Sequence, residues 1–387
     1  MSKKKIHICF NVISDPNWHA GNIYIFNCIH ALTLLSNTER EQVIVSLATR
    51  NKNDIPEDIL LKVDNVFIES IFHIVFYKLL KISPAWLRWK WLNFRKIDFY
   101  YPGGNLPKQW IFKWGGWIPD FQYRYLPHLF SQQELDTREA RSLHAAKHAP
   151  IIAFSSECAL NDYKKFFPDY IGNEFLLRFV SNANKAWLQL DPIETQEKYN
   201  LPDKFFIVCN QFWKHKDHET VIKALAMLKQ KGFQVCVVCT GATEDFRNPE
   251  YYPSLLAKAK ELNVENEFQV VGFISRQDQI QLIRRSMAII QPSLFEGWST
   301  VVEDGRSLGK TIFLSDFPVH IEQNPPYTHY FEQKNAEQLA NLITQYLDEL
   351  SPGPNKEKEE KAFIENQELM KNFGQKLVEM ARVCLAG

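Results

Sequence analysis

The stretch from residue 291 to residue 304 holds the side chains of this sequence best suited to bind a polar ligand. An apolar strand is predicted over residues 287–290, and Glu296 follows it after a Pro-Ser turn. Glu303 and Asp304 come about two helical turns later, in the next predicted helix. Open parallel sheets bind ligands outside the carboxyl ends of their strands. Carboxylates there suit the hydroxyls of a sugar or ribose, whereas they would repel phosphate.

The start of that predicted helix could bind the phosphate itself. Gly297, Trp298, Ser299 and Thr300 lie at this start. A helix N-terminus offers free backbone N–H groups and the positive end of a dipole. The same residues also fit a purely structural role, because Ser and Thr are common N-caps and acids are favoured in a first helical turn.

A second polar loop is cationic. A predicted strand at residues 205–209 runs into Gln211, Lys214, His215 and Lys216, and a helix follows. A basic surface loop without a function would explain these lysines on their own.

Together these segments resemble the retaining GT-B glycosyltransferases of the family-4 type, the glycosyl transferases group 1. The family's hallmark is a Pro-Ser-x-x-Glu-Gly run, a second Glu eight positions after the first, and a glycine five positions further on. Glu296 fits the first acid, Asp304 stands at the second and Gly309 at the glycine, while Glu303 is one position early. The resemblance implies that Glu296 binds donor-sugar hydroxyls and that Asp304 or Glu303 binds the ribose diol. It also implies that the backbone N–H groups of residues 298–300 face the diphosphate.

In the cationic loop the family carries an Arg, then a Lys five residues later, and both neutralise the donor diphosphate. Lys216 matches the Lys, but Gln211 stands where the Arg would be, so one positive charge is missing. Lys214 and His215 are the nearest replacements. This departure would mean a rearranged site, lower activity or loss of catalysis.

The resemblance assigns the nucleotide base to two other strand ends. Gly241 and Gly272 each end a predicted strand, and the backbone of such loops reads the base in similar enzymes. Gly272 and Phe273 are the expected base contacts. Glycines also simply end strands, because they tolerate backbone angles that other residues avoid.

The first half of the chain keeps less of the family pattern. Gly21 is the one remaining glycine at the start of the first helix, where the family brings backbone close to phosphate and acceptor. Pro119 replaces the usual His that contacts the donor sugar. Asp120 and Gln122 could line the acceptor side, with His128 as a further candidate. A turn after a proline would equally explain Asp120.

Composition excludes several classes of function. Lys plus Arg and Asp plus Glu number 45 each, and no nucleic-acid-binding motif occurs, so no nucleic acid partner is expected. No Asp-x-Asp or His-rich cluster indicates a metal site, and no P-loop or dinucleotide fingerprint follows the first strand. We therefore expect a metal-independent protein that is neither a kinase nor a dehydrogenase. The seven scattered cysteines fit reduced thiols, with Cys236 and Cys239 on opposite faces of one strand.

Apolar strands alternate with amphipathic helices along the chain, which is typical of doubly wound parallel sheets. The series restarts after residue 185. We expect an α/β, GT-B architecture: a Rossmann-like acceptor domain at 1–180 and a Rossmann-like nucleotide-sugar donor domain at 181–360, facing across a cleft. The resemblance implies that a final helix, in residues 361–387, crosses back to the first domain.

Aromatic and basic residues concentrate in residues 71–118. Six of the ten tryptophans and eight Lys or Arg lie here, with one acid, Asp98. Such a segment can lie in a lipid headgroup layer, where Trp is favoured, or its aromatic residues can form core. No apolar run reaches the length of a signal or a membrane span. The chain is expected to be cytoplasmic, with peripheral membrane contact through residues 71–118 as an option.

The expected function is the transfer of a sugar from a nucleotide-sugar to an acceptor hydroxyl with retention of anomeric configuration. Polysaccharide or glycolipid assembly is the expected setting, with a saccharide or lipid-linked acceptor and no cofactor. Gln211, Pro119 and the altered second acid leave two alternatives open. One is a non-catalytic GT-B-fold protein that binds nucleotide-sugars, and the other is a sugar-nucleotide epimerase, which would consume donor without an acceptor.

Overall fold

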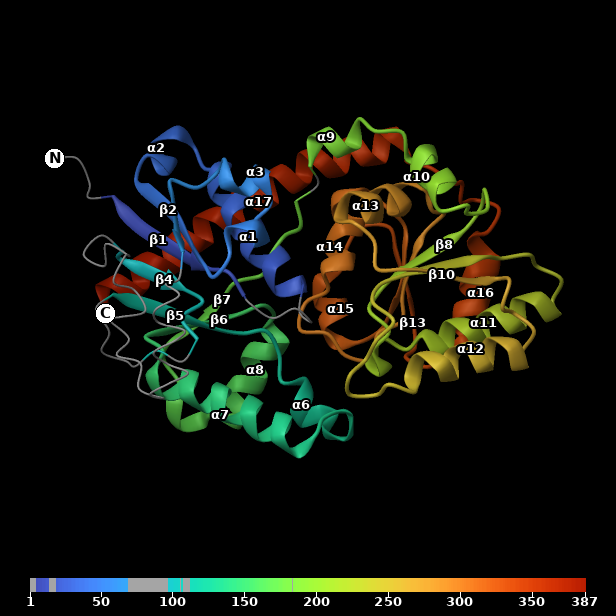
Figure 1. Cartoon of the computed structure of the whole chain (residues 1–387), viewed down its shortest axis with the longest axis horizontal. Helices are drawn as coiled ribbons and strands as arrows, with labels where there is room; N and C mark the ends of the chain where they lie inside the picture. The colour runs from blue at the N-terminus through green and yellow to red at the C-terminus, as the bar shows by residue number, and fades with distance from the viewer. Residues whose placement is uncertain (1–4, 14–18, 69–96, 105, 107–111, 183) are drawn as a thin grey trace. The chain divides into compact units, whose positions relative to one another are not determined.

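The computed structural model describes residues 5–13, 19–68, 97–104, 106, 112–182 and 184–387. The chain divides into two compact units (Figure 1). Unit 1 comprises Met1–Phe121, Asp136–Val180 and Gln367–Gly387, and unit 2 comprises Gln122–Leu135 and Ser181–Asn366. The end of the chain therefore contributes to the unit in which the chain begins.

Unit 1 is built on a parallel sheet that has seven strands within the described residues, in the order β3-β2-β1-β4-β5-β6-β7. The inner strands β1 and β6 are buried along most of their length, as expected for a parallel sheet covered on both faces. The strands are β1 (Ile6–Asn11), β2 (Val43–Thr49), β3 (Asn65–Ile68), β4 (Phe99–Tyr101), β5 (Lys113–Ile118), β6 (Ile151–Phe154) and β7 (Glu174–Leu176).

Unit 2 contains a second parallel sheet, with the strand order β10-β9-β8-β11-β12-β13. The chain adds β9 and β10 on one side of β8, and then β11, β12 and β13 on the other side. The order therefore reverses between β8 and β11. The strands are β8 (Phe206–Cys209), β9 (Val237–Thr240), β10 (Phe268–Gly272), β11 (Ile289–Gln291), β12 (Ile312–Ser315) and β13 (Thr328–Phe331).

Helices connect the strands in both units (Figure 1). They are α1 (His19–Thr33), α2 (Asn37–Arg40), α3 (Glu57–Leu60), α6 (Gln122–Tyr125), α7 (Gln132–His148), α8 (Glu157–Phe166), α9 (Lys185–Leu188), α10 (Pro192–Lys198), α11 (His218–Gln230), α12 (Tyr251–Glu261), α13 (Arg276–Arg285), α14 (Thr300–Ser307), α15 (Pro318–Gln323), α16 (Ala336–Tyr346) and α17 (Lys356–Ala386).

Two element boundaries differ from the sequence-based expectation. The last helix was expected to begin at residue 361, but it begins at Lys356, because the Asn355 side chain accepts the backbone N–H of Lys358 and caps the helix there. The strand expected to contain both Cys236 and Cys239 begins only at Val237. Its neighbour β8 begins opposite that residue, with Phe206 paired to Val237, so the earlier residues have no strand beside them.

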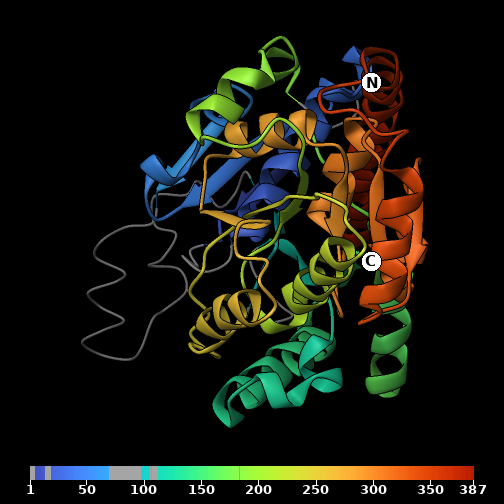
Figure 2. The ribbon, with the colours of Figure 1, turned by 90° about the vertical axis from the view of Figure 1, so that its right-hand side faces the viewer.

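Side chains of the unit 2 sheet alternate between two cores. Phe206 and Val208 lie in a core with residues of α11, α12 and α16, whereas Ile207 lies in a core with residues of α13 and α14. Figures 1 and 2 show helices on both faces of this sheet. Cys239 belongs to the first core and Cys236 packs against the second, which confirms that the two free thiols lie on opposite faces.

A glycine sets how closely α14 lies on the sheet. A Cβ atom at Gly305 would stand 2.6 Å from Cδ1 of Ile312 and 2.9 Å from Cδ1 of Ile289. A larger residue would therefore push the helix away from β11 and β12. Since α14 carries Glu303 and Asp304, Gly305 fixes the position of both carboxylates.

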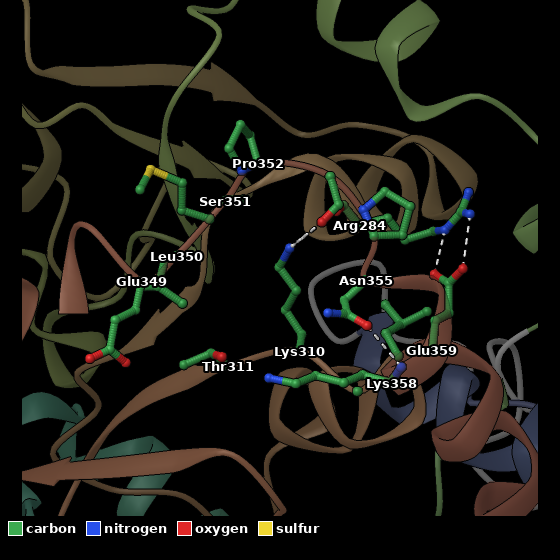
Figure 3. Close-up of a pocket in the computed structure, with 15 residues that line it drawn as sticks. Arg284, Lys310, Thr311, Glu349, Leu350, Ser351, Pro352, Asn355, Lys358 and Glu359 are labelled. Carbon is green, nitrogen blue, oxygen red and sulfur yellow. Dashed lines mark hydrogen bonds and ion pairs between the residues drawn. The ribbon is translucent and has the colours of Figure 1, made fainter.

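The opposite, amino-terminal edge of the unit 2 sheet holds a pocket of about 260 Å³ beside Lys310 (Figure 3). The Lys310 ammonium donates to the carbonyl oxygens of Arg284 (3.1 Å), Gly353 (3.3 Å) and Ser286. Arg284 in turn pairs with Glu359 of α17 at 2.7 Å. An ammonium has three N–H donors, so Lys310 acts as a crosslink between α13 and the loop before α17.

The C-terminal part of α17 packs on α1 within unit 1. Phe373 lies beside Tyr24 of α1, with ring centroids 6.5 Å apart. A Cβ atom at Gly374 would stand only 2.4 Å from the carbonyl oxygen of Ala31. The two backbones therefore approach as closely as they do because residue 374 has no side chain.

We predict that Gly374→Ala destabilises the protein by about 1–3 kcal/mol, because the added methyl group must push α17 away from α1. In an ordinary helix interior the same change would stabilise by roughly 0.5–1 kcal/mol. Asn372→Ala, on the exposed side of α17, is the control and should cost nothing. Urea unfolding of both variants tests this, and a Gly374→Ala variant as stable as the parent would contradict it.

His218, at the start of α11, is a fully buried titratable group. Its ring stacks on Phe212 at a centroid distance of 4.2 Å. Within the described part of the chain neither ring nitrogen has a hydrogen-bond partner. Burial lowers the pKa of His218 to about 3, from an ordinary value of about 6.5. Between these values the unfolded chain binds the proton more readily, so stability is lost as the pH falls.

His218→Phe should therefore reduce the loss of unfolding free energy that occurs as the pH falls. At pH 5 the parent should have lost about 2 kcal/mol of unfolding free energy through this residue, and the variant should keep it. Urea unfolding at pH 5 and pH 7.5 measures the difference, with His128→Phe at an exposed position as the control. Parallel pH profiles for the parent and His218→Phe would refute the assignment.

Candidate functional site

The predicted polar residues meet at the carboxyl edge of the unit 2 sheet, where the strand order reverses between β8 and β11. Such reversal points are where open α/β sheets bind ligands. Asn210, just after β8, donates its side-chain amide to Oε1 of Gln291 at the end of β11 (2.9 Å). This buried contact fixes the two strand ends side by side.

Lys216 and Glu296 form an ion pair at this point, with 2.6 Å between Nζ and Oε1. Only 15% of the Lys216 side chain and 10% of the Glu296 side chain are exposed. The side-chain amide of Gln291 donates to the same Glu296 oxygen at 2.9 Å. A short 3₁₀ turn, Lys214–Lys216, places the lysine, and the backbone N–H of Leu294 donates to the carbonyl oxygen of His215 at 2.8 Å. The two predicted loops are thereby tied together.

The charges around Glu296 favour its ionised form. Burial alone would raise the pKa of Glu296, but the Lys216 ammonium outweighs burial and holds that pKa below its usual value. Burial lowers the pKa of nearby His320 to about 4, so this imidazole is neutral at pH 7. Ser315 fixes its Nδ1 through two contacts, 3.0 Å to the carbonyl oxygen and 3.1 Å to the hydroxyl. At neutral pH the carboxylate is thus ready to accept hydrogen bonds.

The start of α14 does not present all the free donors that the sequence suggests. The backbone N–H of Ser299 donates to Oε1 of Gln323 at 3.0 Å, and the Gln323 amide donates back to the Ser299 carbonyl oxygen at 3.1 Å. A side-chain amide from α15 thus occupies the Ser299 N–H in this structure, and its contact with a diphosphate stays a prediction. Gly297 is buried, and Trp298 and Thr300 are half-buried at the same helix start.

Both acids of α14 are buried in ion pairs. Asp304 is completely buried and pairs with both terminal nitrogens of Arg276. Glu303 accepts from the Gln323 amide at 3.0 Å and from Nε of Arg306 at 3.1 Å. Burial raises the pKa of Glu303 above its ordinary value, against the opposing effect of Arg306. A role for either acid at the ribose stays a prediction.

The glycines at the strand ends have steric reasons to be glycine. Gly241, after β9, has φ +132°, and a Cβ atom there would stand 2.2 Å from the Asn210 carbonyl oxygen. Its backbone N–H donates to the carbonyl oxygen of Gly272 at 2.8 Å. Gly272 has φ +75° with open space around it, and the next residue, Phe273, is 64% exposed. Base contacts through this loop stay a prediction.

A cation that sequence reasoning missed lies in the loop after β9. The Arg247 guanidinium lies 4.6 Å from the ring centroid of Trp213 and 5.0 Å from that of Phe130. Asp245 balances its charge at 3.3 Å. The spacing of the sequence gives no link between residues 213 and 247, so only the fold reveals this contact. Gln323 and Arg276 were missed for the same reason, whereas Gln291 lies within the stretch 291–304 and was not assigned a role.

The remaining predicted residues are spread over the two units. Lys214 is exposed and Gln211 half-buried, both beside Lys216 in unit 2. Gly21 is buried near the start of α1, and Asp120 is half-buried just after β5, both in unit 1. A catalytic or acceptor-side role for Asp120 stays a prediction.

Part of the aromatic segment at 71–118 is core. Trp114 is fully buried in β5, and Trp117 stacks on Tyr24 at a centroid distance of 4.1 Å. The other four tryptophans of this segment lie outside the described residues. No helix in the described part of the chain is both long and apolar enough to cross a bilayer. Among the same residues, no three His, Cys, Asp or Glu side chains gather closely enough to hold a metal ion.

Known proteins with the same architecture were found by fold rather than by overall sequence. A sucrose-phosphate synthase from Thermosynechococcus elongatus matches with a TM-score of 0.68 and 15% identity, over 98% of both chains. Anabaena HepE in complex with UDP and glucose matches with a TM-score of 0.67 and 16% identity, over 97% of this chain and 98% of HepE. A glycosyltransferase from Rickettsia africae matches with a TM-score of 0.65 and 14% identity, over 99% of both.

None of the curated proteins matches this chain. The model of the family described as Glycosyl transferases group 1 matches residues 191–370, which include every unit 2 strand from β8 to β13. That range contains both Lys216 and Glu296. The chain thus has the GT-B fold, and its residues 191–370 match the model of the glycosyl transferases group 1 family.

Proposed function

We propose that this protein is a retaining glycosyltransferase that moves a sugar from a nucleoside diphosphate donor to an acceptor hydroxyl. The observation that carries the proposal is the buried Lys216–Glu296 pair at the reversal between β8 and β11. It lies in the region that matches the glycosyl transferases group 1. Anabaena HepE, a protein of the same fold, has been solved with UDP and with UDP-glucose, which supports a donor of this class.

The two side chains have complementary tasks in this proposal. Lys216 stabilises the diphosphate as the bond between the anomeric carbon and the phosphate oxygen breaks and the electron pair leaves with the phosphate. Glu296 accepts hydrogen bonds from sugar hydroxyls and orients the anomeric carbon. The acceptor oxygen bonds to that carbon on the face that the phosphate leaves, and its proton passes to the departing phosphate oxygen. Configuration is therefore retained.

The diphosphate charge is met by protein groups in this mechanism. Lys216 supplies the cation, and no metal ion is required. The acceptor would be a saccharide or a lipid-linked sugar, used in polysaccharide or glycolipid assembly at the cytoplasmic side of a membrane. Catalysis in EDTA tests the metal-independent part of the proposal directly.

A second candidate function is a nucleotide-sugar-binding protein without turnover. With Gln211 in place of the family's arginine, Lys216 is the cation of this loop that lies at the strand reversal. Glu296 already pairs with it at 2.6 Å. A weaker cationic field at the diphosphate would slow departure of the leaving group more than it would weaken binding. Binding of donor without product formation would favour this candidate.

We expect one nucleoside diphosphate to raise the melting temperature in the presence of EDTA, because a ligand that binds only the folded state stabilises it. Glu296→Gln should retain or tighten binding of the free diphosphate, because Lys216 no longer pairs with a carboxylate, and it should lower sugar transfer by on the order of a hundredfold. Lys216→Met should weaken both. Thermal shift and isothermal titration measure binding, and release of nucleoside diphosphate from the sugar donor measures transfer.

Lys223→Met is the matched control for these assays, because it removes an exposed lysine that pairs with Glu219 on α11. It should change neither binding nor transfer. The proposal fails if no nucleoside diphosphate or nucleotide-sugar binds. Binding of donor with equal transfer by the parent and Glu296→Gln would show that the reaction takes place elsewhere.

The buried ion pair predicts a large coupling energy between Lys216 and Glu296 in the free energy of unfolding. Lys216→Met alone leaves a buried carboxylate without its cation, which should cost about 3–5 kcal/mol of unfolding free energy. Adding Glu296→Gln should restore much of this loss. The exposed Lys223–Glu219 pair is the comparison, with Lys223→Met and Glu219→Gln made singly and together. It should show a coupling energy of at most ~1 kcal/mol. Urea unfolding of both cycles provides the comparison, and additive losses at 216 and 296 would disprove the pairing.

A further inference from the structure

Arg247, in the loop between β9 and α12, is a nearly buried cation. Only 4% of its side chain is exposed. Its guanidinium lies over two aromatic rings, 4.6 Å from the ring centroid of Trp213 and 5.0 Å from that of Phe130. Aromatic rings stabilise the charge of a guanidinium. They are only weak acceptors for its N–H bonds, so those bonds need other partners.

The hydrogen bonds of Arg247 are incomplete. A guanidinium has five N–H donors, and Nε of Arg247 donates to Oδ1 of Asp245 at 3.3 Å. Neither terminal nitrogen has an acceptor among the residues that the structure describes. Arg284 is equally buried, yet its Nη1 donates to the carbonyl oxygen of Leu190 at 2.8 Å and its Nη2 to that of Leu188 at 2.9 Å. The protein thus pairs Arg284 internally, but it leaves two nitrogens of Arg247 unpaired.

Asp245 does not use the terminal nitrogens of its partner. A carboxylate commonly binds a guanidinium through two parallel N–H···O bonds. Asp245 instead accepts through Oδ1 alone, from Nε of Arg247 at 3.3 Å and from its backbone N–H at 3.0 Å. Oδ2 is enclosed and has no hydrogen-bond partner in the described part of the chain. The terminal nitrogens of Arg247 are not enclosed like that oxygen, so a ligand can reach them.

Arg247 is joined to the loop that carries Lys216. Trp213 is the residue directly before the 3₁₀ turn that contains this lysine. Its carbonyl oxygen accepts from the Lys216 backbone N–H at 2.8 Å. The guanidinium over the Trp213 ring therefore contacts the residue that begins this turn.

Residues 122–135 join the same guanidinium to the loop of Glu296. This segment belongs to unit 2 and includes Phe130. Five positions earlier, Tyr125 lies beside Phe295, with ring centroids 5.7 Å apart, and Phe295 directly precedes Glu296. Five residues of chain span at most about 18 Å. One short segment thus contacts both the cation and the loop of the proposed catalytic carboxylate.

An oxyanion would complete this arrangement. Buried charges in proteins are normally paired, and a guanidinium matches phosphate and carboxylate through two parallel bonds. The proposed reaction has two substrates that can carry such a group. Gln211 also stands where the family resemblance places an arginine, so the loop of Lys216 lacks one cation that would meet negative charge.

A purely structural role would use the rings of this cluster and leave its terminal nitrogens without a function. In that case Arg247 would only hold residues 122–135 against the loop of Trp213. A nearly buried donor without an acceptor costs free energy. The two unpaired nitrogens therefore favour a ligand over a clamp.

We propose that the two terminal nitrogens of Arg247 bind an oxyanion of a substrate, a phosphate or a carboxylate, at the same sheet edge as Lys216 and Glu296. This inference rests on the proposed function, because the oxyanion belongs to one of the two substrates of that reaction. Two groups have this chemistry, the diphosphate of the donor and an acid group of the acceptor, and the test separates them.

The test titrates matched anionic and neutral probes into the full chain. UDP, GDP, ADP and CDP, each compared with its nucleoside, represent the donor and are measured by isothermal titration. Glucose 1-phosphate and glucuronate, each compared with glucose, represent an acidic acceptor and are measured by ligand-observed NMR. We expect Arg247→Met to weaken binding of at least one anionic probe by roughly tenfold or more, with its neutral counterpart unchanged. Arg247→Lys should recover only part of the affinity, because an ammonium lacks the planar fork.

Three further variants separate binding from packing. Phe130→Leu removes a ring from the cluster and keeps both nitrogens, so it should lower the melting temperature and leave the affinities nearly unchanged. Asp245→Asn should retain or tighten binding, because it removes a negative charge beside the guanidinium. Arg382→Met, at an exposed arginine of α17, is the matched control and should change neither property. If Arg247→Met does not fold, Arg247→Lys and Asp245→Asn decide the question.

The outcomes distinguish this inference from the proposed function. Lost affinity for a nucleoside diphosphate assigns the oxyanion to the donor, and lost affinity for a sugar acid assigns it to the acceptor. If Arg247→Met binds every anionic probe as tightly as the parent, Arg247 is a structural clamp, and the inference fails while the proposed function stands. If no nucleoside diphosphate binds the parent, the proposed function fails, and the inference fails with it unless an acidic sugar binds through Arg247.

Discussion

A lysine and a glutamate buried side by side at the ends of two neighbouring strands impose the main constraint on unit 2. Burying a charge without a partner is expensive, and four buried or half-buried cations at this edge each have one. Lys216 pairs with Glu296, Arg276 with Asp304, Arg306 with Glu303, and Arg247 with Asp245. The edge of the sheet is therefore rich in charge and close to locally neutral. An anionic ligand can bind one of these cations only by displacing its carboxylate partner. The ion pair that opens most readily therefore decides where the ligand binds.

The pairs differ in how readily they could exchange. Asp304 is completely buried, and its partner Arg276 is held by two further residues. Lys216 and Glu296 both keep some exposed surface, and the Lys216 ammonium makes no other described hydrogen bond. A diphosphate that approaches Lys216 leaves Glu296 with the Gln291 amide as a partner. The geometry thus favours exchange at Lys216 and Glu296, and a fixed, structural role for Arg276 and Asp304.

The sequence predicts those parts of this arrangement that follow from periodicity. Alternating apolar strands and helices predict the parallel sheets, and strands that end beside Lys216 and Glu296 predict that these residues meet, although 80 positions separate them. The contact of Ser299 with Gln323 could not be predicted in this way, because it depends on how α15 and α14 lie against each other. The glycine at position 374 could not be predicted either. A position within a helix favours Ala, and only the close approach of the Ala31 carbonyl oxygen explains the glycine.

The same reasoning shows why a family motif does not fix the role of each of its positions. The motif places an acid eight residues after Glu296, and Asp304 satisfies that register. Aspartate has one methylene fewer than glutamate, so its carboxylate stays close to the helix, where Arg276 and Ser181 reach it. Once those contacts exist, the carboxylate contributes to folding, and a ligand could use it only at the expense of stability. A change of one methylene can therefore convert a ligand-binding position into a structural one while the spacing of the motif stays intact.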